Sequence, residues 1–152
     1  MVLESILAYL HISAILALVV FISSEAALCR PEWMNATVVE RLVKVDRLYG
    51  IAAGAVLVTG LLRIFLGAKG SGYYLGNWLL HVKIAAFVVV GLISIAPTLR
   101  FMRWRKALRA NGALPTPQEV RSARKLVMLQ AHIIPLIPLA AVFLARGFGA
   151  RG

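Results

Sequence analysis

The stretch LESILAYLHISAILALVVFISSEAALC, from Leu3 to Cys29, decides the fold. Its side chains that carry or readily take up charge near neutral pH are Glu4, His11 and Glu25. At about 1.5 Å per residue this stretch reaches about 40 Å as a helix, which exceeds the roughly 30 Å hydrocarbon thickness of a bilayer. We therefore predict a membrane-spanning helix. An imidazole inside such a helix is a candidate functional group.

The composition of the whole chain agrees with this prediction. The 152 residues are 61% hydrophobic and 15% charged, with a mean hydropathy of +0.83, which is typical of a single transmembrane domain over residues 1–152. The net charge of +11 falls in short loops between apolar spans, so it indicates membrane topology and no nucleic-acid partner. Because Cys29 is the only cysteine, the sequence excludes an intrachain disulfide and a thiolate metal cluster.

Three further apolar stretches follow the first. We predict spans over residues 3–29, 37–67, 77–109 and 117–146. Short loops between consecutive spans place neighbouring helices antiparallel. The sequence therefore predicts an all-α integral membrane protein, an up-down-up-down four-helix transmembrane bundle.

Local signals indicate where these helices begin and end. Thr37 and Glu40 have capping-box spacing, as do Thr116 and Glu119, and Asn77 can cap the third span. The Asn111-Gly112 pair is expected to end that span.

Prolines and glycines predict details within the spans. Pro97 should bend the third helix, and Pro135 should free a backbone carbonyl near His132 in the fourth. Gly50 and Gly54 form a small-xxx-small pair, and Ala53 and Gly60 extend this narrow face, which predicts a closely packed neighbour.

The basic residues predict the orientation of the bundle. Twelve of the 17 lie at 30–47 and 100–125, namely Arg30, Arg41, Lys44, Arg47, Arg100, Arg103, Arg105, Lys106, Arg109, Arg121, Arg124 and Lys125. Because positive loops stay in the cytoplasm, we expect both hairpin loops inside and both termini outside, in a bacterial inner membrane.

Two histidines lie near one another in depth in the predicted bundle. His11 lies about 12 Å below the outer end of the first span and His81 about 6 Å below that of the third. The first and third helices are diagonal, and a diagonal of about 13 Å suits two imidazoles on one central metal. We therefore predict haem b with His11 and His81 as its ligands. The alternatives left open are a local hydrogen bond for His11, for example to Ser13, and an interfacial role for His81.

Three basic residues lie at the predicted outer end of the bundle, the same end as both histidines, where the charge distribution predicts few basic residues. Arg63, Lys69 and Lys83 lie near the depth of both histidines and suit haem propionates, since guanidinium and ammonium groups pair with carboxylates. The alternative is that these side chains snorkel to lipid phosphates.

A second polar group is expected at the cytoplasmic end. Glu25 follows His11 by fourteen positions, which places it about 40° away around the helix and about 21 Å deeper. We expect Glu25 and Asp46 to form an ion-pair cluster with basic neighbours such as Arg47 and Arg100. The alternative is a proton path from Glu25 to His11.

With these residues identified, the chain resembles a family of small bacterial predicted membrane proteins of unknown function. The elements that carry the resemblance are AYLHISAI at 8–15, DRLYG at 46–50, TGLLR at 59–63, Lys69-Gly70, Tyr74, Asn77, Ser94, Pro97-Thr98, Trp104-Arg105 and ARGFG at 145–149.

The chain is more distantly similar to HemJ-type protoporphyrinogen oxidases and CopD-like membrane proteins. This similarity rests on the early His11 and on Trp78-Leu-Leu-His81-Val-Lys83. It implies haem b binding and a site role for His11.

Three functions are compatible with these patterns. The leading hypothesis is an inner-membrane haem-b-binding protein, with redox activity and enzymatic turnover left open. The second is a non-enzymatic accessory subunit of a larger membrane complex, or a homo-oligomer. The third is proton or cation transport. The lipid bilayer is the partner common to all three.

Overall fold

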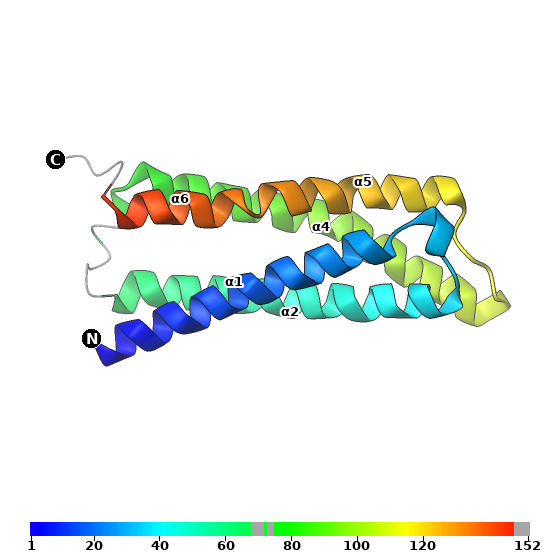
Figure 1. Ribbon diagram of the computed structural model, residues 1–152, viewed down its shortest axis with the longest axis horizontal. Coiled ribbons are helices and arrows are strands. Elements are labelled where there is room, and N and C mark those ends of the chain that lie inside the picture. Colours follow the sequence, from blue (N-terminus) through cyan, green and yellow to red (C-terminus); the bar gives the residue numbers. More distant parts are fainter. Residues whose placement is uncertain (68–71, 73–74, 148–152) are drawn as a thin grey trace.

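The chain forms a bundle of long helices (Figure 1). The computed structural model describes residues 1–67, 72 and 75–147, and no strand occurs among them. The elements, in chain order, are α1 (Val2–Leu28), the short 3-10 helix η1 (Pro31–Trp33), α2 (Ala36–Leu66), α4 (Trp78–Asn111), α5 (Pro117–Ile133) and α6 (Leu136–Ala145).

Four helical stretches are long and apolar enough to cross a membrane. They cover Val2–Leu28, Ala36–Leu66, Trp78–Asn111 and Pro117–Ala145. These bounds agree with the predicted spans to within two residues, so the prediction of an all-α four-span bundle is confirmed. The N-terminus and the end of α6 lie at one end of the bundle, which we call the terminal end, and the α1–α2 and α4–α5 connections lie at the other, the hairpin end (Figure 1). That the terminal end faces outward stays a prediction.

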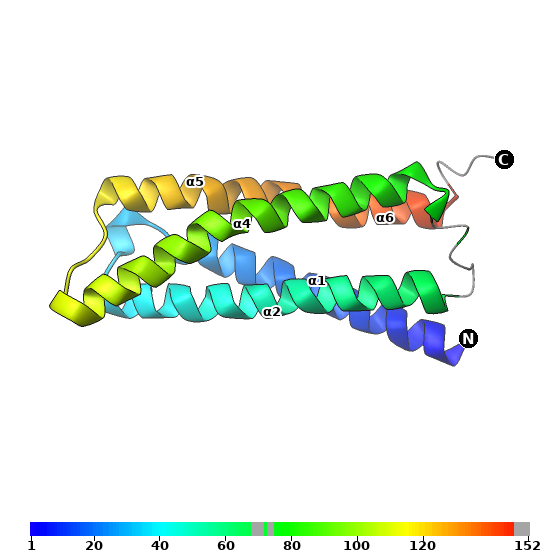
Figure 2. The ribbon, with the colours of Figure 1, turned by 180° about the vertical axis from the view of Figure 1, so that it is seen from behind.

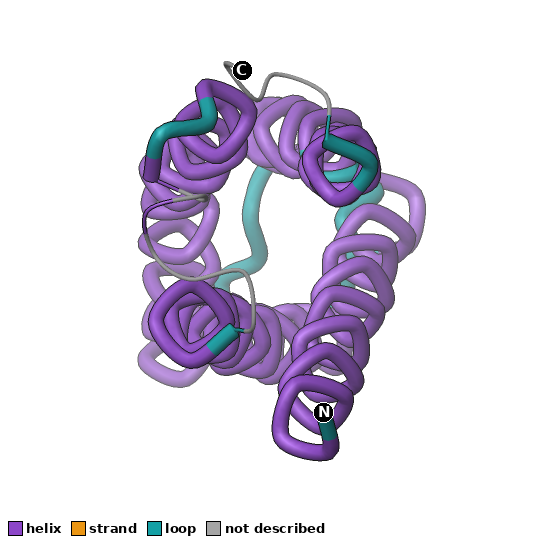
Figure 3. Tube along the Cα trace, turned by 90° about the vertical axis from the view of Figure 1, so that its left-hand side faces the viewer, coloured by secondary structure: helices purple, strands orange, loops and turns teal. Residues whose placement is uncertain are grey.

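The helices form a ring when viewed along the bundle from the terminal end (Figure 3). The α1 helix packs most extensively on α2 and also contacts α5, whereas α4 packs on α2, α5 and α6. The first and third spans are therefore diagonal, as predicted. Because α1 is inclined to the bundle and leans toward α5, its N-terminal part lies away from α6 (Figure 1).

The main hydrophobic core lies in the hairpin half. Leu42, Phe101, Val120 and Val127 are fully buried there, and the Phe101 and Trp104 rings lie 5.4 Å apart at a tilted angle. The second hydrophobic cluster, in the terminal half, is small and consists of Leu79, Leu80 and Leu144. This uneven filling leaves room for a cavity in the terminal half.

The capping signals are largely confirmed. Thr116 and Glu119 form a complete capping box, and the Asn77 side chain accepts a hydrogen bond from the Leu79 amide. Gly112 ends α4 in the left-handed conformation, with φ of 73°, which a residue without Cβ adopts freely.

The predicted cap of the second span was wrong, although the span begins within one residue of its predicted start. Asn35, rather than Thr37, caps α2 by accepting from the Val38 amide at 2.9 Å. Glu40 instead accepts two hydrogen bonds from Arg109, at 2.8 and 3.0 Å. This ion pair joins the start of α2 to the end of α4, which lie side by side at the hairpin end (Figure 2).

Prolines shape the later helices. The fourth span breaks between Ile133 and Leu136 into α5 and α6, as expected where Pro135 cannot donate a backbone hydrogen bond. The α4 helix continues without interruption through buried Pro97. His132 donates to the Met128 carbonyl at 2.6 Å, not to a carbonyl that the prolines free.

The predicted close approach at Gly50 and Gly54 is not found. Both residues are exposed, and no atom lies within 4 Å of a Cβ built at either position. Close packing of α2 occurs instead at Ala52 and Gly60.

Candidate functional site

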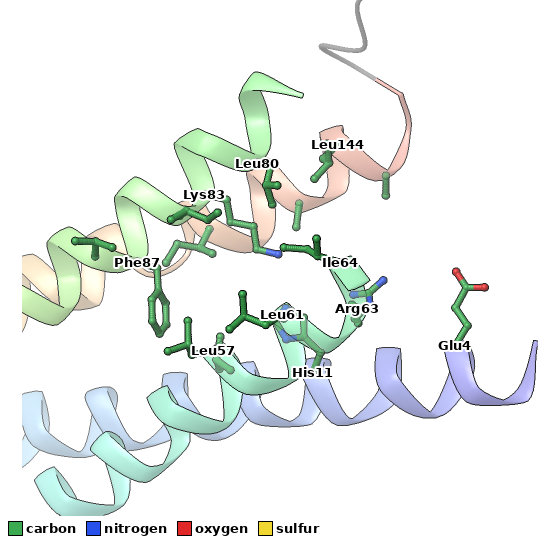
Figure 4. Close-up of a pocket in the computed structure, with 17 residues that line it drawn as sticks. Glu4, His11, Leu57, Leu61, Arg63, Ile64, Leu80, Lys83, Phe87 and Leu144 are labelled. Atoms are coloured by element: carbon green, nitrogen blue, oxygen red, sulfur yellow. The ribbon is translucent and has the colours of Figure 1, made fainter. Parts of the chain in front are cut away.

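A cavity of about 350 Å³ lies in the terminal half of the bundle. Its walls come from α1 and α2 on one side and from α4 and α6 on the other (Figure 4). Most lining side chains are apolar, including Leu61, Leu80, Phe87 and Leu144. The volume and the apolar walls are those of a site for a small organic molecule.

His11 lines this cavity and is 3% exposed. Its Nδ1 atom lies 2.8 Å from the Thr59 hydroxyl oxygen. Because the Thr59 hydroxyl donates to the Ala55 carbonyl at 2.6 Å, Thr59 can only accept from the imidazole. In the neutral ring the proton is therefore on Nδ1, and Nε2 keeps its lone pair. That Nε2 is buried and has no hydrogen-bond partner.

Gly60 provides the surface against which the His11 ring packs. A Cβ at position 60 would lie 3.2 Å from the imidazole Cε1 and 3.8 Å from Nδ1, and the former distance is too short for a relaxed contact. The missing side chain thus lets α1 and α2 approach at the height of His11. Together Thr59 and Gly60 hold the ring in one orientation.

Arg63 and Lys83 also line the cavity, from α2 and α4 (Figure 4). Both cations act electrostatically on His11, and Arg63 acts on Lys83. Neither forms an ion pair within the part of the chain that the structure describes. Glu4 is at the cavity too, so two cations and one carboxylate surround an apolar space and leave an excess of positive charge.

His81 is not brought together with His11. Its side chain is exposed and absent from the cavity lining, and its Nε2 donates to the Leu75 carbonyl at 3.0 Å. Residues two positions apart on a helix point about 200° apart. Because Lys83 faces the cavity, His81 faces away from it. Lys69 lies outside the described residues.

The second polar group lies in the hairpin half. Glu25 is 1% exposed and Asp46 is 9% exposed. Thr98 donates to an Asp46 oxygen at 2.9 Å, and Tyr49 donates to Gln130 at 3.0 Å. These five residues come from α1, α2, α4 and α5.

The basic residues expected at these carboxyl groups point elsewhere. Arg47 is exposed, and Arg100 donates to the Ser122 hydroxyl at 3.0 Å. Neither Glu25 nor Asp46 has an ion pair within residues 1–67, 72 and 75–147. The structure thus assembles the carboxyl groups without the predicted cations.

No polar path joins the carboxyl groups to the cavity through the described side chains. Thr59 is bonded to His11, and Gln130 is bonded to Tyr49. Between the two sites along α1 and α2, the buried residues are Leu18, Ile22, Tyr49, Ala52 and Val56, and of these only Tyr49 is polar. The two polar regions are therefore separate sites.

Sequence reasoning missed two residues of these sites, Tyr49 and Thr98, whereas it did place Gly60 on a narrow face of the second span, where His11 now packs. Tyr49 follows Asp46 by three positions, which places both on one helix face, so its membership could have been foreseen. Thr98 gave no such signal, because its role depends on how another helix packs.

Metal ligands are sparse in the described part of the chain. No group of three or more His, Cys, Asp or Glu side chains gathers there in a way that could hold a metal ion. His11 could therefore serve only a metal whose other ligands come from elsewhere, as the four ring nitrogens of haem do.

Comparisons with known proteins place the chain in a family rather than beside a characterised relative. No curated protein matches the chain, and no solved structure matches it. The resemblance to HemJ-type oxidases and CopD-like proteins thus receives no support from them. A family model described as "Predicted membrane protein (DUF2214)" matches residues 3–149. With that match and its four membrane-length helices, the chain belongs to the DUF2214 family of predicted membrane proteins.

Proposed function

We propose that this protein binds haem b in the terminal-half cavity, with His11 as its single protein ligand and with Arg63 and Lys83 beside the propionates. One observation carries the proposal: His11, whose Nε2 is buried and has no hydrogen-bond partner, lines a cavity together with two cations that form no ion pair among the described residues. Haem, when bound, would supply one-electron redox chemistry at its iron.

Each feature of the cavity corresponds to a different part of this ligand. The apolar walls suit a macrocycle, and the excess positive charge suits carboxylates. A metal-binding histidine usually donates its second ring nitrogen to a fixed acceptor, which orients the ring. The Nδ1–Thr59 hydrogen bond at 2.8 Å is such an arrangement.

The proposal departs from the two-histidine ligation expected from the sequence. His81 is bonded to the Leu75 carbonyl outside the cavity. A single imidazole therefore remains, and the proposal assigns no protein ligand to the opposite face of the macrocycle.

The optical spectrum of the full chain in lipid nanodiscs tests the proposal. Purified protein is titrated with haem, and we expect a saturable Soret band at one haem per chain. His11→Ala should abolish the saturable band, whereas the matched variant His81→Ala should retain it. Arg63→Gln and Lys83→Gln should each weaken haem binding. A wild-type protein that takes up no haem, or equal spectra for wild type and His11→Ala, would overturn the proposal.

A second candidate is a metal-free amphipathic anion, such as a fatty acid. The specific observation in its favour is that His11 Nε2 is covered by neighbouring atoms, whereas the two cations and the apolar walls already line a space. The volume of about 350 Å³ also lies near the lower limit for ligand sites.

Fatty-acid binding separates the two candidates. A fluorescent fatty acid is titrated into detergent-solubilised protein, with Lys83→Gln and His11→Ala as the variants. The second candidate predicts weaker binding for Lys83→Gln and unchanged binding for His11→Ala. Binding that is indifferent to Lys83→Gln would contradict it.

A further inference from the structure

We infer that Glu25 and Asp46 form a proton-binding carboxyl pair in the hairpin half, in which Glu25 carries an exchangeable proton and Asp46 is its charged neighbour. This site is separate from the terminal-half cavity, so the inference does not depend on the proposed function.

The first support is the burial of both groups within membrane-length helices. Glu25 of α1 is 1% exposed, and Asp46 of α2 is 9% exposed. The two carboxyl groups are close enough for Asp46 to act electrostatically on Glu25. An ionised carboxylate in such surroundings loses its hydration and needs a compensating partner.

The second support is an unpartnered oxygen at the centre of the group. Glu25 Oε1 is buried and makes no hydrogen bond. Asp46, by contrast, accepts from the Thr98 hydroxyl at 2.9 Å. A hydrogen bond to a carboxylate stabilises its charged form. The negative charge is therefore better accommodated on Asp46, and the proton on Glu25.

The neighbouring charged and titratable groups do not replace that proton. The α2 helix contributes Tyr49, whose hydroxyl is bonded to Gln130. From α5, Arg124 donates to the Ala26 carbonyl and to the Cys29 carbonyl, the latter at 3.2 Å. From α4, Arg100 is bonded to Ser122. Among the described residues, none of these forms an ion pair with either carboxyl group.

The buried Cys29 thiol is the remaining titratable neighbour. Burial raises the pKa of Cys29 to about 12, so this thiol is neutral at physiological pH and adds no negative charge; a thiol supplies no cation in either state. Two carboxyl groups with no compensating cation do not both ionise readily, and they titrate as a pair. One proton therefore remains on the pair near neutral pH.

The location of the pair determines where this proton exchanges. Glu25 lies three residues before Leu28, the end of α1, which is about 5 Å along the helix axis. On the other side, Leu18, Ala52 and Val56 separate the pair from the His11 cavity. The proton therefore exchanges with the hairpin side, and the pair is a one-sided binding site rather than part of a path across the membrane.

Infrared spectroscopy of the full chain in lipid bilayers tests this inference. A protonated carboxyl group has a carbonyl band distinct from those of carboxylates. We expect such a band at neutral pH, shifted in heavy water because the proton exchanges. Glu25→Gln should abolish it. Asp46→Asn should leave a shifted band that titrates at lower pH, since the neighbouring charge is gone. Glu32→Gln, at an exposed carboxyl group, should change nothing.

Three spectroscopic results would overturn the inference: no protonated band in the wild type, a band that survives Glu25→Gln, or a band that disappears on adding sodium ions at constant pH. The last would assign the pair to a metal cation.

Thermal unfolding gives a second readout if a variant is damaged. A glutamine mimics a neutral glutamic acid in shape and charge, so Glu25→Gln should match the wild-type melting temperature at neutral pH. At alkaline pH only the wild type should be destabilised, because its pair is forced to ionise. A Glu25→Gln protein that melts well below wild type at neutral pH would show that the charge is needed, and would contradict a proton on Glu25.

Discussion

His11 and Thr59 are joined across the α1–α2 interface by a hydrogen bond of 2.8 Å. The direction follows from the Thr59 hydroxyl, which is already committed to the Ala55 carbonyl. This single bond determines which ring nitrogen is left for a ligand, and it links the packing of two helices to the chemistry of the cavity.

The tautomer of His11 is therefore predictable. In the wild type, nitrogen NMR of histidine-labelled protein should show the proton of neutral His11 on Nδ1. Thr59→Val keeps the side-chain shape but removes the acceptor, so the Nδ1 tautomer should lose its preference. Because loss of such a supporting bond typically weakens metal binding by about 10- to 100-fold, haem affinity should fall accordingly. Thr98→Val, which alters a distant hydroxyl, should leave the His11 signals unchanged; an unaltered spectrum for Thr59→Val would contradict the assignment.

Replacing Gly60 and Gly54 by alanine should change the free energy of unfolding in opposite directions. Both lie within α2, where replacing glycine by alanine favours the helix by about 0.5–1 kcal/mol. At position 54 no atom lies within 4 Å of the new Cβ, so Gly54→Ala should be neutral or stabilising.

At position 60 the new Cβ lies 3.2 Å from the His11 ring. Overpacking of this kind costs about 1–3 kcal/mol, so Gly60→Ala should lower the free energy of unfolding by about 1 kcal/mol net. Denaturant titration in mixed micelles measures both variants. Equal effects at the two positions would rule out a packing role for Gly60.

Arg124 stabilises the end of α1 from a distant part of the chain. Its guanidinium donates to the Ala26 and Cys29 carbonyls, which lack partners within their own helix. Losing a hydrogen bond from a charged donor costs about 1.5–3 kcal/mol, so Arg124→Ala should lower the free energy of unfolding by about that amount.

The matched control for Arg124 is Arg121→Ala, because Arg121 is exposed on the same helix. Circular dichroism during thermal unfolding should separate the two variants by several degrees. Equal melting temperatures for Arg124→Ala and the wild type would refute the role of Arg124.

The orientation of the bundle is testable by fusion reporters. Twelve of the 17 basic residues occur at the hairpin end, and the positive-inside rule then places the termini outside. Alkaline phosphatase fused to the C-terminus should be active, and a green fluorescent protein fused there should be dark. Fusions after Gly112, in the α4–α5 connection, should behave oppositely. A fluorescent C-terminal fusion would reverse the assignment.

The element boundaries were predictable because their causes are local. Apolar length decides where a helix can cross a bilayer, and the Thr116–Glu119 capping box acts within four residues. The one wrong cap illustrates the limit. Glu40 has capping-box spacing from Thr37 but is drawn to Arg109, sixty-nine positions away in sequence, and Asn35 caps the helix instead.

The sequence could predict which residues are candidates for the site, but it could not predict toward which side of the helix each side chain points. His11, Arg63 and Lys83 do line one cavity, whereas His81 points away although its depth is similar. The depth of a residue follows from its position along a helix. The direction in which its side chain points depends on the rotation of the helix about its own axis, and the neighbouring helices determine that rotation. The positions of Lys83 and His81, two apart on α4, already made it impossible for both to face one space.

By itself the sequence determined four membrane-length helices, their antiparallel order and the position of each polar residue along its helix, because hydrophobic length and local capping act along a single segment. Tertiary structure alone decided that His11 packs on Gly60 and that Glu25 and Asp46 are both buried with no ion pair among the described residues. Such relationships depend on the rotation and tilt of whole helices against one another. Many weak contacts spread over the bundle select these angles, and no short stretch of residues encodes them.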